Sequence, residues 1–127
     1  MRALLIKSPH IEKILGGKKI WEMRGSRTNI RETVGLIRSG SGTVIGVCDV
    51  VDCIGPLTAG EYRKNARKAG TTPSEAIIGY YGKTFAWVLK NPRNLKAPVP
   101  YKHPSGAIIW VQLDAKTERA VQSALKR

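Results

Sequence analysis

The sequence predicts an α+β fold, a small mixed β-barrel of five to six strands with short helices packed outside it. Runs of β-branched and other apolar residues, bounded by Gly and Pro, indicate the strands. Capping signals indicate short helices between them, and these helices do not alternate regularly with the strands. A length of 127 residues with 42% hydrophobic content fits one domain, residues 1–127, around one core.

The N-terminal half begins with a short apolar run, residues 2–6, that suits a buried strand. Ser8 and Pro9 then predict a helix start, with Ser8 as the N-cap and Pro9 in the first turn. The apolar residues of this helix share one face, and a Gly pair at residues 16–17 ends it. Three extended segments follow, of which the last two form a predicted hairpin: residues 18–24, 33–38 and 43–54.

The C-terminal half contains two Thr-x-x-Glu capping boxes, at residues 58–61 and 72–75. They predict helices over residues 59–69 and 73–80. The segment 91–104 is too rich in proline for a central strand, so we expect it to be a connection. The remaining predicted elements are two strands and a C-terminal helix capped by Asp114: residues 84–90, 106–113 and 115–126.

The charge balance gives the first indication of function. The chain has 22 Lys and Arg against 9 Asp and Glu, which is a formal net charge of +13. Residues 1–38 carry nine bases and three acids, residues 62–102 carry nine bases and one acid, and residues 39–61 carry no base. Such self-repulsion destabilises a compact state, which points to a partner of opposite sign. Two basic segments folded into one positive face would fit a nucleic acid, and a generally basic surface without a specific site is the alternative.

Other partners are not expected. No apolar run reaches the roughly 18–20 residues of a membrane span, and the N-terminal apolar stretch is too short for a signal peptide. Cys48 and Cys53 lie in one predicted strand at positions that face opposite sides, so we expect buried, reduced thiols in a cytoplasmic protein. His10 and His103 are isolated in the sequence, and we expect no metal ion and no other cofactor.

The densest group of polar residues follows the Gly pair, at residues 17–24 (GKKIWEMR). Lys18 and Lys19 are favoured beside a helix C-terminus, and Glu22 and Arg24 share one face of a strand. One interpretation is therefore a solvated strand edge at which the acidic and basic side chains neutralise one another. On a regular strand Lys19 and Glu22 would face opposite sides, and they converge only if the strand begins after Lys19.

Four motifs in order resemble one known family. Gly17-x-Lys19-x-x-Glu22-x-Arg24 resembles the signature of the ASCH domain, a branch of the PUA-like β-barrel superfamily. The lead-in IKSP at residues 6–9, the strand VIGVCDVVD at 44–52 and the late loop at 91–100 are similar to further elements of small stand-alone ASCH proteins. The similarity covers residues 3–113.

The resemblance implies a small barrel with an electropositive cleft and an association with RNA. Individual members are described as single-strand ribonucleases or as amidohydrolases acting on acetylated cytidine. Carried over by position, Lys19 and Glu22 become the catalytic residues of any enzyme activity. The residues implied in contacts with RNA or its phosphates are Lys7, Ser8, Lys18, Arg24, Asn91 and Arg93. The bacterial amidohydrolases have Lys-x-x-Thr at the octet, and their catalytic acid aligns near Ala69-Gly70, where this chain has no acid.

A binding module needs only a basic cleft for the backbone of single-stranded RNA and exposed aromatic rings that stack on unpaired bases. The first candidates for stacking are Trp21 and Tyr101. Further candidates are Tyr80 and Tyr81. Trp87 and Trp110 lie inside apolar strands, and we assign both to the core.

Two enzymatic interpretations use the same octet. In a metal-independent ribonuclease, Lys19 would act as a base with a depressed pKa, Arg24 would hold the phosphate and Glu22 would transfer a proton. In an amidohydrolase, Lys19 would activate water against the amide of acetylated cytidine, with Glu22 as proton shuttle. We favour the RNA-binding module, with hydrolysis as the alternative.

Overall fold

The computed structural model describes residues 1–80 and 82–125, and in these residues six strands form one sheet in the order β2-β5-β4-β3-β1-β6. The strands are β1 (Arg2–Ile6), β2 (Trp21–Arg24), β3 (Thr33–Arg38), β4 (Thr43–Ile54), β5 (Phe85–Pro100) and β6 (Trp110–Gln112). The helices are α1 (His10–Leu15), α2 (Ala59–Lys64), α3 (Pro73–Gly79) and α4 (Ala115–Ala124). β1 and β3 are parallel and every other neighbouring pair is antiparallel, so the sheet is mixed.

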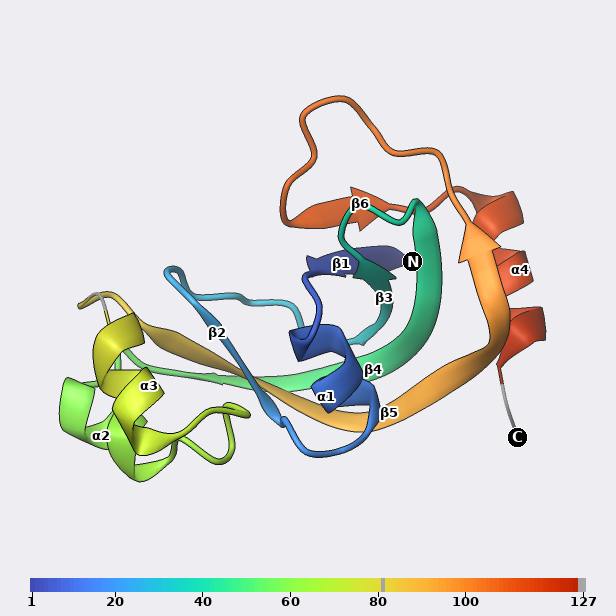
Figure 1. Cartoon of the computed structure of the whole chain (residues 1–127). Coiled ribbons are helices and arrows are strands. Elements are labelled where there is room, and N and C mark those ends of the chain that lie inside the picture. The colour runs from blue at the N-terminus through green and yellow to red at the C-terminus, as the bar shows by residue number, and fades with distance from the viewer. Residues whose placement is uncertain (81, 126–127) are drawn as a thin grey trace.

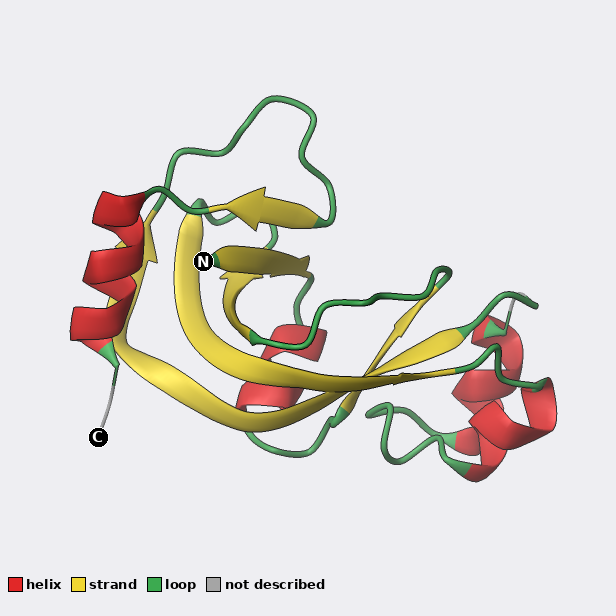
Figure 2. Ribbon diagram, turned by 180° about the vertical axis from the view of Figure 1, so that it is seen from behind, coloured by secondary structure: helices red, strands yellow, loops and turns green. Residues whose placement is uncertain are grey.

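The sheet is strongly curled because its two longest strands, β4 and β5, bend together around the core (Figure 1). Their pairing shifts register at three places, and such irregularities increase the local twist and bend of a strand. Figure 2 shows the resulting half-barrel with α4 at one end and α2 and α3 at the other. The predicted α+β fold, a small mixed barrel with short helices outside it, is confirmed, and the sheet stays open between its edge strands β2 and β6.

The main core lies inside the curl and is covered by α1. Trp87 and Trp110 stack there with their ring centroids 5.8 Å apart, which agrees with their predicted place in the core. α1 approaches the sheet closely at Gly46 of β4, where a Cβ atom would lie 2.4 Å from a methyl group of Leu15. The same Cβ atom would lie 2.8 Å from the carbonyl oxygen of Arg93 on β5, so a larger residue at Gly46 would disturb both the packing of Leu15 and the pairing of β4 with β5.

β5 is longer than the sequence predicted. It runs through the Pro-rich segment that we expected to be a connection, and it pairs with β4 as far as Pro100. β2 covers β5 only over residues 85–88. Beyond that point no named strand pairs with the other edge of β5 in the described residues, where Leu89 N–H donates to the Ile20 carbonyl oxygen and Leu95 forms an isolated bridge with Leu125. Pro92 and Pro98 therefore lie on an edge, where proline is tolerated. Conversely, β6 is much shorter than the strand predicted over residues 106–113.

The helices begin at the predicted signals, with two differences. Both capping boxes form, at the starts of α2 and α3, although α2 is shorter than predicted. Ser8 is not the N-cap of α1, because Pro9 occupies that position and the Ser8 Oγ donates instead to Glu12 Oε2 at 2.9 Å. Asp114 caps α4 by accepting the Thr117 N–H at 2.7 Å. Within the described residues, no helix has the length and apolar character needed to span a membrane.

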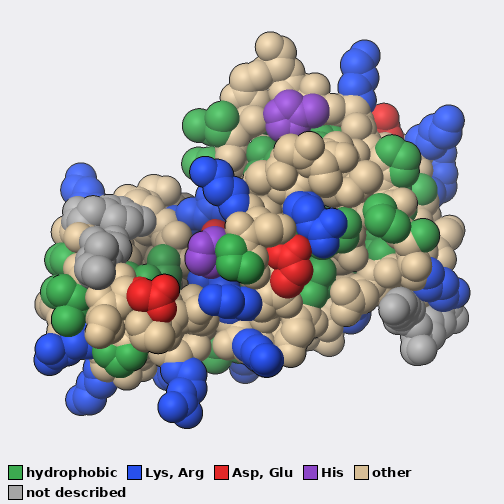
Figure 3. Space-filling view, viewed as in Figure 1, with side chains coloured by type: hydrophobic (Ala, Val, Ile, Leu, Met, Phe, Trp, Pro, Cys, Tyr) green, Lys and Arg blue, Asp and Glu red, His purple; other side chains and the backbone are tan. Residues whose placement is uncertain are grey.

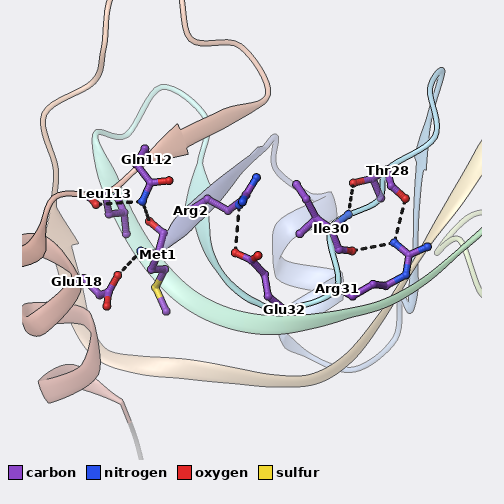
Figure 4. Close-up of polar contacts among 9 residues, drawn as sticks. All are labelled: Met1, Arg2, Thr28, Ile30, Arg31, Glu32, Gln112, Leu113 and Glu118. Atoms are coloured by element: carbon purple, nitrogen blue, oxygen red, sulfur yellow. Dashed lines mark hydrogen bonds and ion pairs between the residues drawn. The ribbon is translucent and has the colours of Figure 1, made fainter.

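Contacts at the chain ends join α4 to β1 (Figure 4). The N-terminal ammonium of Met1 pairs with Glu118 of α4, and Gln112 Nε2 donates to the Met1 carbonyl oxygen at 3.1 Å. Arg2 Nε donates to Glu32 Oε2 at 3.1 Å on the neighbouring part of the sheet. The last residue of the predicted C-terminal helix, Lys126, lies outside the described residues.

Both cysteines are free and buried, and both lie in the same apolar cluster. The expectation that they face opposite sides of the sheet is wrong. A register shift in β4 between Val50 and Asp52 inserts the irregularity that returns Cys53 to the side of Cys48. Burial raises the pKa of the Cys48 thiol to about 12.

Candidate functional site

The turn after α1 determines where Lys19 points. Gly17 has a φ of +79°, a left-handed conformation that favours glycine, at the place where the chain leaves the helix. β2 begins only at Trp21, so Lys19 precedes the strand and is not bound by its alternation. Lys19 Nζ lies 3.5 Å from Glu22 Oε1. The strand therefore begins after Lys19, which is the condition that allows Lys19 and Glu22 to converge.

Arg24 joins Glu22 to a strand on the other side of the open barrel. Its Nε lies 3.0 Å and its Nη2 2.8 Å from Glu22 Oε2. Nη2 also donates to the carbonyl oxygen of Leu5 on β1 at 2.9 Å. The guanidinium lies 5.6 Å from the centroid of the Trp87 ring. Because β2 and β1 are not neighbours in the sheet, Arg24 forms a side-chain bridge between them.

Lys19 faces inward rather than toward solvent. Only 4% of the residue is exposed, and its ammonium donates to the carbonyl oxygen of Ala69 at 2.7 Å. Burial lowers the pKa of Lys19, although the neighbouring Glu22 carboxylate acts in the opposite direction. Lys13 Nζ donates in the same way to the carbonyl oxygen of Gly70, at 2.8 Å. The structure therefore gives Lys19 a fastening role, because it holds the segment that follows α2 against the start of β2.

Glu22 and Arg24 face a small cavity of about 230 Å³, which we call the inner cavity. Lys7, from the predicted lead-in, stands at the same cavity. Its lining residues come from β1, β2, α1 and three connecting segments: Leu5, Ile6, Lys7, His10, Glu22, Arg24, Ser39 and Ile108. Lys19 is absent from this lining and contacts a separate, largely apolar cavity of about 260 Å³ behind β2, together with Asn91.

His10 is the residue of this site that the sequence analysis missed. It is the first residue of α1 and lines the inner cavity with Glu22 and Arg24. Partial burial lowers the pKa of His10, and the nearby charge of Lys19 lowers it further, so the imidazole is neutral at pH 7. Its position directly after the IKSP lead-in, which already pointed to this site, is the sequence signal that could have identified it.

A second hollow of about 610 Å³, the outer pocket, shares Leu5, Lys7, Ser39 and Ile108 with the inner cavity. Tyr101, a predicted stacking residue, is half-buried at its wall. The Tyr101 hydroxyl lies 2.8 Å from His103 Nδ1, and the His103 Nε2 lies 3.0 Å from the carbonyl oxygen of Ala107. Ile108 is 80% exposed at the border of the two hollows, so an apolar surface lies between them.

The other predicted site residues lie away from the inner cavity. Asn91 and Arg93 both turn to Asp49, with Arg93 Nη2 2.8 Å from Asp49 Oδ1 and Asn91 Nδ2 3.4 Å from Asp49 Oδ2. Ser8 contacts Glu12, as described above, and does not line the cavity. Lys18 is exposed and lines a third hollow, beside α2. The family resemblance implied that Asn91 and Arg93 contact RNA together with Arg24. In the structure, neither residue lies beside Glu22 and Arg24.

Trp21 is not an exposed platform, so its assignment as a stacking residue is corrected. It is 6% exposed and packs in a small apolar cluster, with Lys68 Nζ 5.2 Å from its ring centroid. Tyr80 is held by its hydroxyl, which donates to the carbonyl oxygen of Leu57 at 3.0 Å. Tyr81 lies outside the described residues. Tyr101 is therefore the predicted stacking residue that borders a hollow next to the inner cavity.

The surface around the site is predominantly basic. Figure 3 shows Lys and Arg side chains over α1, around the end that carries α2 and α3, and also along the side that carries α4. No group of three or more His, Cys, Asp and Glu side chains that could hold a metal ion occurs in the described part of the chain.

Residues 4–99 match the family model described as the ASCH domain. Solved structures with a similar fold include that of ASCH from Zymomonas mobilis, which has a TM-score of 0.75 and 13% sequence identity over 99% of this chain and 96% of that one. A tyrosine-to-phenylalanine variant of that protein gives a TM-score of 0.72, also at 13% identity, over 98% of both chains. At this identity the similarity concerns the fold alone. A comparison with curated proteins gives no significant match.

Proposed function

The chain belongs to the ASCH domain family, and we propose on this premise that it is an RNA-binding domain that holds single-stranded RNA, with one unpaired nucleotide in the inner cavity. The observation that carries the proposal is the Glu22–Arg24 pair at that cavity. A volume of about 230 Å³ lies below the roughly 300–1,000 Å³ of sites for drug-sized ligands. It suits one planar ring better than a longer piece of RNA.

The polar groups at the cavity are suited to a nucleobase. Arg24 uses Nε and Nη2 within the protein, whereas Nη1 makes no hydrogen bond with the described residues. A guanidinium donor beside a carboxylate acceptor can match a base edge that carries both an acceptor and a donor. Lys7, at the border of the inner cavity and the outer pocket, is well situated for a phosphate. Tyr101 at the outer pocket offers a ring for the next base, where a stack is worth about 1–3 kcal/mol.

The test of this proposal replaces Arg24 by lysine, which keeps the positive charge. Arg24→Lys removes the planar fork, so we expect binding of a single-stranded RNA oligomer to weaken by roughly tenfold or more, as for a lost charge-assisted hydrogen bond. Arg93→Lys changes the same residue type at a site away from the cavity and should bind like the wild type. Fluorescence anisotropy with a labelled 12-nucleotide RNA measures both variants. Wild-type affinity that is independent of salt, or equal for duplex DNA, would contradict the proposal.

Metal-independent hydrolysis, as a ribonuclease or as an amidohydrolase on acetylated cytidine, is the alternative proposal. The observation in its favour is that His10 and Glu22, two groups that can transfer protons, line the same cavity. Lys19, the base expected from the sequence, does not line that cavity, and its ammonium is held by Ala69. In this alternative Glu22→Gln and His10→Gln should each lower turnover about 100-fold with little change in binding. Activity that persists unchanged in both variants would indicate a contaminating nuclease.

We also propose that the protein acts in a reducing compartment such as the cytoplasm. Cys48 and Cys53 are both free thiols, buried in the core, and unpaired buried thiols are typical of reducing compartments. Fluorescence microscopy of the tagged protein, expressed in the organism from which it comes, tests this localisation.

A further inference from the structure

A second feature, the hollow beside α2 that Lys18 lines, has about 700 Å³ of space, and we call it the α2 groove. Its lining comes from two segments that are distant in the sequence, the turn after α1 and the stretch from α2 to the start of α3. The lining includes no Asp or Glu. Its basic members are Lys18, Arg63, Lys64, Arg67 and Lys68. Ile20, which is 41% exposed, contributes an apolar surface between them.

None of these five cations forms an ion pair with an acid among the described residues. Lys68 lies over the Trp21 ring, but Lys18, Arg63, Lys64 and Arg67 have no side-chain partner among the described residues. Elsewhere four arginines each pair with one acid, in the pairs Arg2–Glu32, Arg24–Glu22, Arg38–Glu12 and Arg93–Asp49. The groove therefore gathers five cations that form no ion pair with a described acid, and such a cluster attracts an anion.

The two acids that flank the α2–α3 stretch of the groove are committed to other contacts. Glu61 and Glu75 each close a capping box, in which the carboxylate accepts the N–H of Thr58 or Thr72. These contacts lower the pKa of both carboxyl groups, so they are ionised but tethered at the helix starts. Neither carboxylate forms an ion pair with an arginine or lysine of the groove in the described residues.

The α2 groove and the inner cavity are connected through residues 18–22. The backbone N–H groups of Ile20 and Trp21 both donate to the carbonyl oxygen of Lys68 at 2.9 Å. Lys19, one residue from each of Lys18 and Ile20, donates to Ala69 and contacts Glu22. The segment of residues 18–22 thus contributes Lys18 and Ile20 to the groove and Glu22 to the inner cavity.

We propose that the α2 groove binds the sugar-phosphate backbone of the RNA strand next to the nucleotide in the inner cavity. The proposal deepens the proposed function and rests on it. Exposed cations without an ion pair and with no acid among them fit a run of phosphates, which carry one negative charge per nucleotide. The exposed Ile20 side chain lies where the sugar or base face of that strand would pass. A single-stranded strand is favoured, because its backbone can bend from a groove into a cavity that admits one ring.

The test compares two triple variants that remove the same charge. Arg63→Gln/Lys64→Gln/Arg67→Gln changes the groove, and Lys96→Gln/Lys116→Gln/Arg119→Gln changes exposed cations at or near α4, at the opposite end of the molecule (Figure 1). The probe is a labelled 12-nucleotide single-stranded RNA, titrated between low and physiological salt. Each lost phosphate contact should reduce the slope of log affinity against log salt by about 0.7. The groove variant should therefore lose about 2 in slope and about 50-fold in affinity at about 0.15 M salt, while the α4 variant changes little.

A second probe separates this proposal from the proposed function. Nucleoside monophosphates reach the inner cavity without needing the groove, so the groove variant should bind them as the wild type does. Equal losses in both triple variants, or an unchanged slope in the groove variant, would overturn the groove and leave RNA binding intact. A wild type that binds no RNA would overturn the proposed function itself. Far-ultraviolet circular dichroism and the thermal midpoint check that both variants are folded.

Discussion

Gly70→Ala tests whether the segment after α2 is held rigidly against the site. Gly70 has a φ of +72°, and a Cβ atom there would lie 3.0 Å from the Cβ and 3.2 Å from the Cγ and Cδ of Lys19. The Lys19 stem cannot simply move aside, because its ammonium is bonded to Ala69 and contacts Glu22. An alanine at position 70 is therefore unfavourable for two reasons. Its backbone would have to adopt a left-handed conformation, and its methyl group would press against the buried Lys19 side chain.

The size of the effect follows from these two obstacles. A left-handed conformation costs a non-glycine residue about 1–2 kcal/mol, of which about 0.4–1 kcal/mol is regained through the less flexible unfolded chain. Forcing a methyl group against a packed side chain costs about 1–3 kcal/mol more. Gly40→Ala is the matched control, because Gly40 has a φ of +82° and nothing within 4 Å of the added Cβ. The free energy of unfolding should therefore fall about 1–3 kcal/mol further in Gly70→Ala than in Gly40→Ala.

Urea unfolding followed by tryptophan fluorescence measures this difference, with unchanged m values showing that both variants unfold from comparable states. Thermal unfolding gives a second estimate, at roughly 2–8 °C per kcal/mol for domains of about this size. If the two variants lose the same stability, the Lys19 stem gives way freely. The fastening of residues 68–70 to the Glu22 network would then be refuted.

Three further outcomes are expected. The folded-state pKa of His10 is lowered, so the unfolded chain takes up its proton first as the pH falls below about 6.5 and stability declines there; urea titrations at pH 7 and 5.5 should show a smaller decline in His10→Gln. Cys48, with a pKa of about 12, should react with iodoacetamide only after unfolding, and mass spectrometry of labelled peptides would reveal any native reaction. Asp114→Ala should lose about 1 kcal/mol of unfolding free energy and Asp114→Asn much less, because asparagine keeps the acceptor for the Thr117 N–H.

The parts of the fold that depend on neighbouring residues could be predicted from the sequence. The capping boxes that begin at Thr58 and Thr72 contain the groups that satisfy each helix start, so the starts of α2 and α3 were predicted correctly. The place of the later part of β5 in the sheet depends instead on where β2 begins, at Trp21 opposite Val88. The prolines of β5 are tolerated because β2 begins only opposite Val88 and leaves them on an edge, and no local pattern in residues 91–104 contains that information.

The sequence predicted which residues belong to the site better than it predicted where their side chains point. The octet indicated that Lys19, Glu22 and Arg24 belong together, and the structure brings their side chains into one network. The inward direction of Lys19 depends on its bond to Ala69, fifty residues further along the chain. His10 was overlooked for a similar reason, since only the packing of α1 beside β1 and β2 brings it to the cavity.

The inner cavity exists because the barrel does not close. β2 is a four-residue edge strand, and no strand pairs with its free side in the described residues. In place of backbone hydrogen bonds, Arg24 spans the opening to Leu5 with one guanidinium nitrogen while Nη1 has no partner among the described residues. Without Arg24, the Leu5 carbonyl oxygen of β1 and the Glu22 carboxylate of β2 would both lose the guanidinium donor that they share. The same arginine therefore holds the two strands at the spacing that the cavity needs and presents a donor to whatever enters it.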